Sequence, residues 1–293
     1  MKKIKGDLRS MAMTVQVEST CYSGRKLGKK ETQSLIDSIG CADDAVRVNK
    51  FIIPKDIIDG PIKARLEAYQ LRDRLSVPWT ANGVGLVRAD QIEIFQTKMG
   101  ELERKFWKDV DYMIERYEIF FDALYQNGSE RMGSSFDESD YPTPSELRAK
   151  YRFKIHYGNL ADSKDWRVNL PKEKLQELAV AASEREKDLI HQGIRAAWER
   201  LYKVVSHMAE RINFGPDDDK KIFRDTLTGN IAELCEILPL LNITGDPDLE
   251  QVGKEIYDKL ATADPAMLRE DHVYRKKAKD EADEILEKMK GLF

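Results

Sequence analysis

The sequence predicts a mainly α-helical protein with a long antiparallel helical hairpin, a small N-terminal α/β module and a C-terminal helical bundle. Two long stretches, about residues 90–126 and 170–212, repeat apolar residues every three or four positions, as amphipathic helices do. Short segments before residue 54 alternate apolar and polar residues, as half-buried strands do. The predicted domains are residues 1–85 for the module, 86–212 for the long helices with a loop-rich insertion at 127–168, and 213–293 for the bundle.

Alternation and turn residues define the N-terminal module. Thr14–Tyr22 and Val46–Ile53 are predicted strands, and the alternation allows the second to pair with the first. Between them, Lys30–Ile39 is predicted as a short helix that Gly40 ends, since glycine readily adopts the left-handed conformation found after helices.

The module is followed by a helix and a loop. Pro61 suits the first turn of a helix that continues to about Leu75, because the first turn leaves the missing N–H unused. Residues 77–85, with their proline, asparagine and glycines, predict a loop. Asp90 is the predicted N-cap of the first long helix, and Asn127-Gly128 is its predicted end.

A long apolar seam runs along the first long helix. Its steps of three and four residues keep one stripe apolar, as required for lengthwise packing against another helix. One extra step of four, between Phe106 and Val110, is a stutter that locally unwinds a supercoil. The seam comprises Ile92, Phe95, Met99, Leu102, Phe106, Val110, Met113, Tyr117, Phe120 and Leu124.

The second long helix carries a similar rhythm from Leu175 to Ile212, and we expect it to lie antiparallel to the first. The insertion between them is too long for a simple helix–helix turn, so it is a subdomain, a functional loop or a partly disordered segment. Shorter helices are predicted at about residues 217–241, 248–261 and 265–289.

Composition restricts the class of protein. Of 293 residues, 34% are charged, yet the net charge is only −4, so no global field attracts nucleic acid or an anionic membrane. Cys21, Cys41 and Cys235 are scattered, which predicts free thiols in a reducing compartment. The sequence shows neither a signal peptide nor about 20 consecutive apolar residues. We therefore expect a soluble cytoplasmic protein.

Motifs of catalysis are missing from the sequence, and we predict no catalytic, cofactor-binding or metal-binding residue. The Gly24–Lys30 turn has three residues between its glycines where a phosphate-binding loop has four, and Lys30 stands where the magnesium-binding hydroxyl belongs. Acidic residues favour helix N-termini, which explains Asp217-Asp218-Asp219. Nucleotide binding at the Gly24 turn is the least favoured hypothesis.

Two basic stretches are candidate contacts for a partner protein or nucleic acid. The first is the turn after the first strand. The second is an extended segment in which basic and aromatic residues alternate, as single-stranded nucleic acid requires. Burial of its aromatic side within a strand is the favoured alternative. The candidate residues are Arg25, Lys26, Lys29, Lys30, Tyr151, Arg152, Lys154, His156, Tyr157, Trp166 and Arg167.

The segment Tyr22-Ser23-Gly24-Arg25-Lys26-Leu27 resembles the start of an uncharacterised family of bacteriophage and mobile-element proteins, although Gly28 follows Leu27 and a second family lysine is missing. Members of that family are often encoded beside a MoxR-type AAA+ ATPase and a von Willebrand A-type protein. The resemblance implies an adaptor for such an ATPase in a bacterial host cell, and it assigns no site residue.

These observations favour a non-enzymatic scaffold or adaptor that self-associates or binds a protein such as a AAA+ ATPase. The apolar seam is the expected association surface, because its phenylalanines offer more apolar area than one neighbouring helix covers. The alternative is an accessory nucleic-acid-binding protein of phage DNA metabolism, contacted through the two basic stretches.

Overall fold

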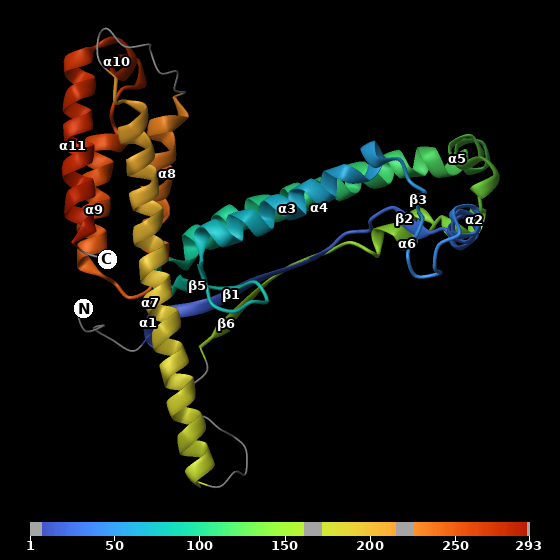
Figure 1. The fold of residues 1–293 in the computed structure, drawn as a ribbon, viewed down its shortest axis with the longest axis horizontal. Helices are drawn as coiled ribbons and strands as arrows, with labels where there is room; N and C mark the ends of the chain where they lie inside the picture. The colour runs from blue at the N-terminus through green and yellow to red at the C-terminus, as the bar shows by residue number, and fades with distance from the viewer. Residues whose placement is uncertain (1–7, 161–171, 215–224, 292–293) are drawn as a thin grey trace. The chain divides into compact units, whose positions relative to one another are not determined.

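The computed structural model describes residues 8–160, 172–214 and 225–291, and the chain is mainly helical with a small antiparallel sheet, as predicted (Figure 1). It forms two compact units, each assembled from several stretches, whereas the sequence analysis predicted consecutive domains. Unit 1 comprises Met1–Gln16, Asp73–Gln96 and Tyr157–Phe293, and unit 2 comprises Val17–Arg72 and Thr97–His156.

Two antiparallel helices dominate unit 2, α3 (Lys55–Leu75) and α4 (Ile92–Asp122) (Figure 1). The ion pairs that join them are Arg116–Asp56 at 2.6 Å and Lys105–Glu67 at 2.5 Å. Helix α3 begins six residues before Pro61, so the predicted start is wrong. The burial of Ile57 and Ile58 favours this added turn, because their apolar surface leaves water only when the helix extends over them.

The apolar seam of α4 is buried within the chain. Six of its members expose 1% or less of their surface: Phe95, Met99, Phe106, Val110, Met113 and Tyr117. In unit 2 the Phe106 ring lies 5.1 Å from Phe153 and 6.5 Å from Tyr151, beside the strand β6 (Arg152–Asn159). The predicted periodicity is thus confirmed, but the buried seam is not the association surface that the sequence analysis expected.

The larger sheet has four strands in the order β4-β5-β1-β6. Strand β1 (Ala12–Thr20) was predicted, and it pairs antiparallel with β5 (Val84–Arg88), so that Thr14 lies opposite Leu86. The prediction of a loop over residues 77–85 is confirmed for residues 79–83 and wrong at both ends, which belong to β4 (Val77–Pro78) and the start of β5. The sequence pattern did not predict this strand because Gly85 interrupts the alternation of apolar and polar side chains. Glycine is required here, since a Cβ at Gly85 would lie 2.1 Å from Ser76 Oγ.

A second sheet, which we call the small sheet, pairs β2 (Arg25–Leu27) with β3 (Asn49–Phe51). The predicted pairing of the segment around β3 with the first strand is therefore wrong. Helix α2 (Lys29–Ile39) connects the two strands, and it ends at Gly40 with φ +66°, as predicted.

The chain after α4 folds back through α5 (Leu124–Met132), two 3₁₀ turns and α6 (Pro144–Arg148) before it enters β6. The predicted helix end at Asn127-Gly128 is wrong, because α5 runs through both residues. Gly128 instead makes room for Phe136, since a Cβ at Gly128 would lie 2.1 Å from Phe136 Cε2. The described part of the predicted insertion is thus built from short helices and one strand.

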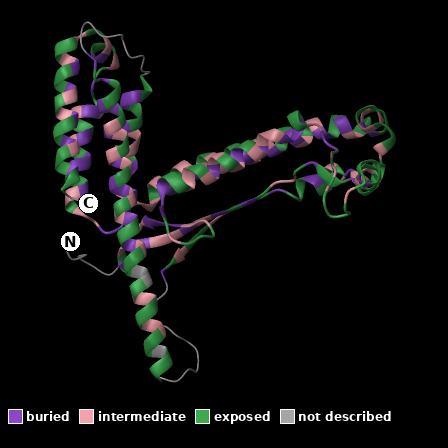
Figure 2. Ribbon diagram, in the orientation of Figure 1, coloured by how far each residue is buried: buried purple, intermediate pink, exposed green. Residues whose placement is uncertain are grey.

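Unit 1 is mostly helical: α7 (Lys172–Arg211), α8 (Thr226–Leu241), α9 (Pro247–Ile256), α10 (Pro265–Glu270) and α11 (His272–Lys290). Helix α7 packs against α8 and α11, and among its described side chains the buried ones lie from Ile190 onward (Figure 2). The predicted hairpin of the two long helices is not confirmed, because α3 is the antiparallel neighbour of α4 in unit 2. The predicted last helix is divided at Asp271, whose side chain caps α11.

Buried Arg275 connects α11 to the rest of unit 1. Its Nε donates to the carbonyl of Phe214 at 3.3 Å, and its Nη1 donates to the carbonyls of Leu268 at 3.0 Å and Arg269 at 3.2 Å. The guanidinium also lies 3.8 Å from the centre of the Phe214 ring. The described carboxylates form no ion pair with it, so carbonyl oxygens and a ring face stabilise this charge.

No helix in the described ranges combines the length and the apolar character needed to cross a bilayer.

Candidate functional site

The small sheet holds the basic turn that the sequence analysis selected. Gly24 enters it with φ +65°, and a Cβ at this position would lie 2.5 Å from Ile58 Cδ1, so the turn requires glycine. The N–H of Gly28 donates to the carbonyl of Val48 at 2.9 Å and closes the other end of the ladder. Residues 25–27 are therefore strand, and the Gly28 N–H is already used within the protein.

The N-terminus of α2 is fixed to the same ladder through Thr32. The Thr32 hydroxyl donates to the carbonyl of Gly28 at 2.6 Å and accepts from the N–H of Val48 at 3.0 Å. One hydroxyl thus joins the first turn of α2 to the segment that leads into β3.

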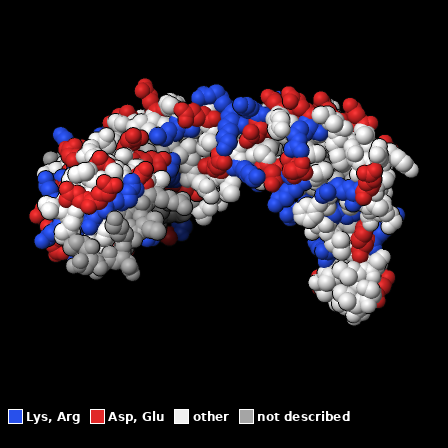
Figure 3. All heavy atoms as spheres, turned by 90° about the horizontal axis from the view of Figure 1, so that it is seen from above, with Lys and Arg blue, Asp and Glu red and all other residues white. Residues whose placement is uncertain are grey.

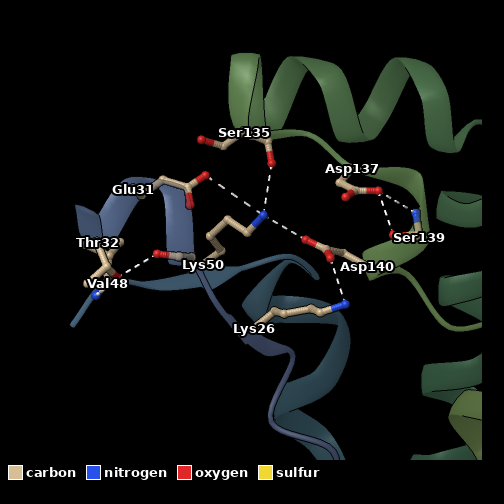
Figure 4. Close-up of polar contacts among 10 residues, drawn as sticks. Lys26, Glu31, Thr32, Val48, Lys50, Ser135, Asp137, Ser139 and Asp140 are labelled. Carbon is tan, nitrogen blue, oxygen red and sulfur yellow. Dashed lines mark hydrogen bonds and ion pairs between the residues drawn. The ribbon is translucent and has the colours of Figure 1, made fainter. Parts of the chain in front are cut away.

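Lys26 and Lys50 project from one face of the small sheet to a shared carboxylate, Asp140 (Figure 4). Lys26 Nζ lies 2.8 Å from Asp140 Oδ1, and Lys50 Nζ lies 2.8 Å from Asp140 Oδ2. Asp140 ends a 3₁₀ turn, Glu138–Asp140, so a single side chain connects both strands to that turn.

Lys50 has two further neighbours. Its ammonium donates to the backbone carbonyl of Ser135 at 3.2 Å and lies 4.0 Å from Glu31 Oε1 (Figure 4). We call Lys26, Lys50, Asp140, Glu31 and Ser135 the Asp140 cluster. Its members come from β2, β3, α2 and the segment after α5, so the cluster ties these elements together.

The charges in the Asp140 cluster change the acidity of its carboxyl groups. Burial raises the pKa of Asp140, but the hydrogen bonds from Lys26 and Lys50 outweigh it and hold the pKa below its usual value. A hydrogen bond with the Ser135 side chain lowers the pKa of Glu31. Both carboxylates are thus ionised at neutral pH, and the ammonium groups of the two lysines compensate them.

The opposite face of the small sheet is exposed. Side chains of directly opposed residues share a face, so Arg25 and Phe51 lie on it, together with Leu27 two residues along. Leu27 is 43% exposed and Phe51 is 45% exposed. The Arg25 guanidinium lies 4.7 Å from the centre of the Phe51 ring, at the distance of a cation–π contact.

A shallow pocket opens beside Phe51. Arg131 borders it, and its Nε donates to the backbone carbonyl of Phe51 at 3.0 Å. The pocket is lined by Glu31, Val48, Asn49, Lys50, Phe51, Arg131, Met132 and Ser135. Apolar, cationic and anionic groups thus meet at the edge of the exposed face.

Lys29 and Lys30 begin α2 and are exposed, directly after Leu27 and Gly28. A cation at a helix N-terminus opposes the helix dipole, so helix stability does not explain them. Together with Arg25 they place positive charge around the exposed apolar side chains of the small sheet.

The second basic stretch forms the strand β6, and its predicted aromatic side is buried at Tyr151 and Phe153 but not at Tyr157. Tyr151 and Phe153 are 3% and 4% exposed, so their rings are not available to stack on nucleic acid bases. Arg152, Lys154 and His156 are exposed on the other side of β6.

The remaining candidates of this stretch differ in their surroundings. Tyr157 is 40% exposed, and its ring meets Phe95 edge to face at 6.4 Å. His156 Nε2 lies 2.9 Å from Glu18 Oε2. The predictions for Trp166 and Arg167, and for Asp217-Asp218-Asp219, fall outside the described residues.

Over residues 8–160, 172–214 and 225–291, no three His, Cys, Asp or Glu side chains gather as a metal site. No family model, no curated protein and no solved structure matches this chain.

Sequence reasoning missed the residues that organise the site. Phe51 and Lys50 were visible only as part of an alternating segment, and the sequence gives no sign that Asp140 meets them. Leu27 was visible beside the basic residues of the turn, but its exposure depends on which face of the small sheet is covered.

Proposed function

We propose that this chain is a non-enzymatic phage or mobile-element protein that acts as an oligomeric scaffold or adaptor, with a AAA+ ATPase as its candidate partner. The observation that carries the proposal is the exposed face of the small sheet. Leu27 and Phe51 remain exposed there although the Asp140 cluster fixes the sheet from its other side.

The exposed face of the small sheet has the composition of a protein-binding surface. An apolar centre with a charged rim is the usual composition of a protein-binding patch. Arg25, Lys29 and Lys30 supply positive charge, so the complementary surface carries an apolar side chain flanked by acidic residues. Because the Asp140 cluster already fixes the sheet in the free protein, little conformational entropy is lost when the partner binds.

The test is the affinity of the purified chain for a MoxR-type AAA+ ATPase, the candidate partner. The double variant Leu27→Ser with Phe51→Ala removes the apolar centre and is expected to weaken binding at least about tenfold, as loss of a buried anchor does. Val273→Ser removes another exposed apolar side chain, 77% exposed in α11, and serves as the control. Equal affinity of the double variant and the control contradicts the assignment of this face.

A second candidate function, nucleic-acid binding, is favoured by the exposed row on β6. Arg152 and Lys154 form no ion pair with any described residue, so their charges are free for phosphates. Neutralising two phosphates gives a slope of about −1.8 in log K against log salt for duplex DNA. An Arg152→Gln, Lys154→Gln variant with unchanged affinity for oligonucleotides at low salt eliminates this candidate.

A further inference from the structure

A charged stripe runs along α4 on the side opposite its buried seam. A shallow groove is lined entirely by residues of this helix: Gly100, Glu103, Arg104, Trp107, Lys108, Asp111, Tyr112 and Glu115. We call this set the outer stripe. Its steps of three, four and one return to the same side of the helix, and all of its members belong to unit 2.

The outer stripe faces solvent. Arg104, Lys108, Asp111 and Glu115 are exposed, and Tyr112 exposes 61% of its surface. At Gly100 an added Cβ would meet only Arg104 Nη1, at 3.7 Å, so the start of the stripe is open to the approach of another chain. Figure 3 shows Lys and Arg interspersed with Asp and Glu over the face that it draws.

The charges of the outer stripe are ordered along the helix. Apart from Glu103 near its start, its two cations, Arg104 and Lys108, precede its two anions, Asp111 and Glu115. Arg104, Lys108 and Glu115 form no ion pair with any residue in the described ranges, whereas Asp111 pairs with Arg148 of α6. Three of these four charges are therefore free for an external partner.

This order makes the stripe complementary to itself. When a second copy of the helix lies antiparallel, its anionic half meets the cationic half of the first copy, and the reverse contact forms at the same time. Such two-fold self-complementarity is what an isologous dimer interface requires. A parallel copy would oppose like charges, so the charge order also selects the orientation.

We propose that two copies of this chain associate through antiparallel contact of their outer stripes, with Arg104 of each copy facing Glu115 of the other and Lys108 facing Asp111. Trp107 and Tyr112 lie at the flanks of this charged row, where their rings limit access of water to the ion pairs. The proposal rests on the oligomeric part of the proposed function and supplies its surface.

The size of the stripe sets the expected affinity. From Gly100 to Glu115 the helix rises about 22 Å at 1.5 Å per residue, which is short for an interface. Small interfaces form weak or transient complexes. The dimer is therefore expected in the micromolar range, and its affinity should fall as salt screens the ion pairs.

The test is sedimentation equilibrium of the full chain over a range of micromolar concentrations, with two single variants. Arg104→Glu places two anions at each contact, and Glu115→Arg places two cations there. Each variant alone is expected to raise the dimer Kd at least about tenfold, as facing like charges do. An equimolar mixture of the two variants is expected to restore a dimer, because the carboxylate introduced in one chain then meets the guanidinium introduced in the other.

The controls separate the stripe from a general charge effect. Lys276→Glu and Glu270→Arg make the same charge changes at exposed positions of unit 1, and both should leave the Kd unchanged. A wild-type chain that stays at 33.7 kDa throughout overturns the proposal, as do single variants that dimerise like the wild type or a mixture that stays monomeric.

Failure here is distinguishable from failure of the proposed function. The Arg104→Glu variant keeps the small sheet intact, so its affinity for the AAA+ ATPase can be measured as a monomer. Retained binding with no wild-type dimer overturns only the self-association, whereas a wild-type dimer without ATPase binding leaves the outer stripe supported and the assigned partner rejected.

Discussion

The Lys50 ammonium lies 2.8 Å from Asp140 Oδ2, and the two side chains expose only 12% and 8% of their surface. This contact connects β3 to the 3₁₀ turn before α6, and the same carboxylate holds Lys26 of β2. The relationship explains how a sheet with three residues in each strand is held from one face while Leu27 and Phe51 stay exposed on the other. A two-stranded sheet of this length is not stable alone, so the ion pairs supply part of its support.

Asp140→Asn is expected to lower the free energy of unfolding by about 2–3 kcal/mol, because it leaves two ammonium groups without their shared anion. Urea unfolding of the full chain measures this change. Glu67→Gln is the matched control, since Glu67 and its partner Lys105 are 44% and 47% exposed and such pairs contribute about 0–1 kcal/mol. Equal losses of unfolding free energy in the two variants would contradict the claim that burial makes the Asp140 ion pairs more stabilising than an exposed pair.

Acid should destabilise the folded chain, because carboxylates that form ion pairs in the folded state become protonated. The pKa of Asp140 is lowered in the folded state, so its contribution to stability is complete above the unfolded pKa of about 4 and is lost as the pH falls through the lower folded value. The pKa of Glu255 is also lowered, by hydrogen bonds from Lys288 and Lys259. The free energy of unfolding should therefore fall below about pH 4, and Asp140→Asn should reduce this slope. An unchanged slope in the variant contradicts the assignment.

Substitution by alanine at two helical glycines should change the free energy of unfolding in opposite directions. Gly128→Ala places a methyl group against Phe136, and the clash is expected to cost about 1–3 kcal/mol. Gly229→Ala in α8 meets nothing within 4 Å, so improved helix propensity should add about 0.5–1 kcal/mol. Thermal unfolding of both variants checks the pair, and a stabilised Gly128→Ala variant would contradict the packing described for α5.

Arg275→Met is expected to lower the free energy of unfolding by about 2–4 kcal/mol, because it removes the donor from two buried carbonyls and one partly buried carbonyl. Arg275→Lys should restore only part of the loss, since an ammonium lacks the planar fork and stacks poorly on Phe214. The neighbouring exposed position provides the control, Lys276→Met, with an expected change within about 0.5 kcal/mol. Urea unfolding distinguishes the three variants, and a neutral Arg275→Met would show that the carbonyls find other donors.

The sequence predicted the helices better than the sheets. The seam of α4 was recognised because a period of three and four residues is a local property, and burial of Phe106 and Val110 confirms it. Which elements cover the seam depends on contacts between segments distant in sequence. In unit 2, α3 and β6 contact α4, and the spacing of apolar residues does not predict these contacts. The same reason accounts for the wrong partner given to the segment around β3.

The candidate site was predicted only in part. The basic turn drew attention to Arg25 and Lys26, but the structure divides them between an exposed face and the Asp140 cluster. Alternation along β6 predicted the buried side of Tyr151 and Phe153 correctly, because period-two patterns report which face is covered. Asp140 could not be selected, since an acidic residue in a polar segment carries no local sign of its ion pairs.

The central claim is that this protein acts by contacting other protein chains, and the solution mass tests it most directly. Light scattering of the purified chain at low salt, over a concentration series and with or without short oligonucleotides, separates the alternatives. We predict a mass that rises from 33.7 kDa toward twice that value with protein concentration and does not respond to nucleic acid. A monomer at every concentration that gains mass only when oligonucleotides are added contradicts the claim.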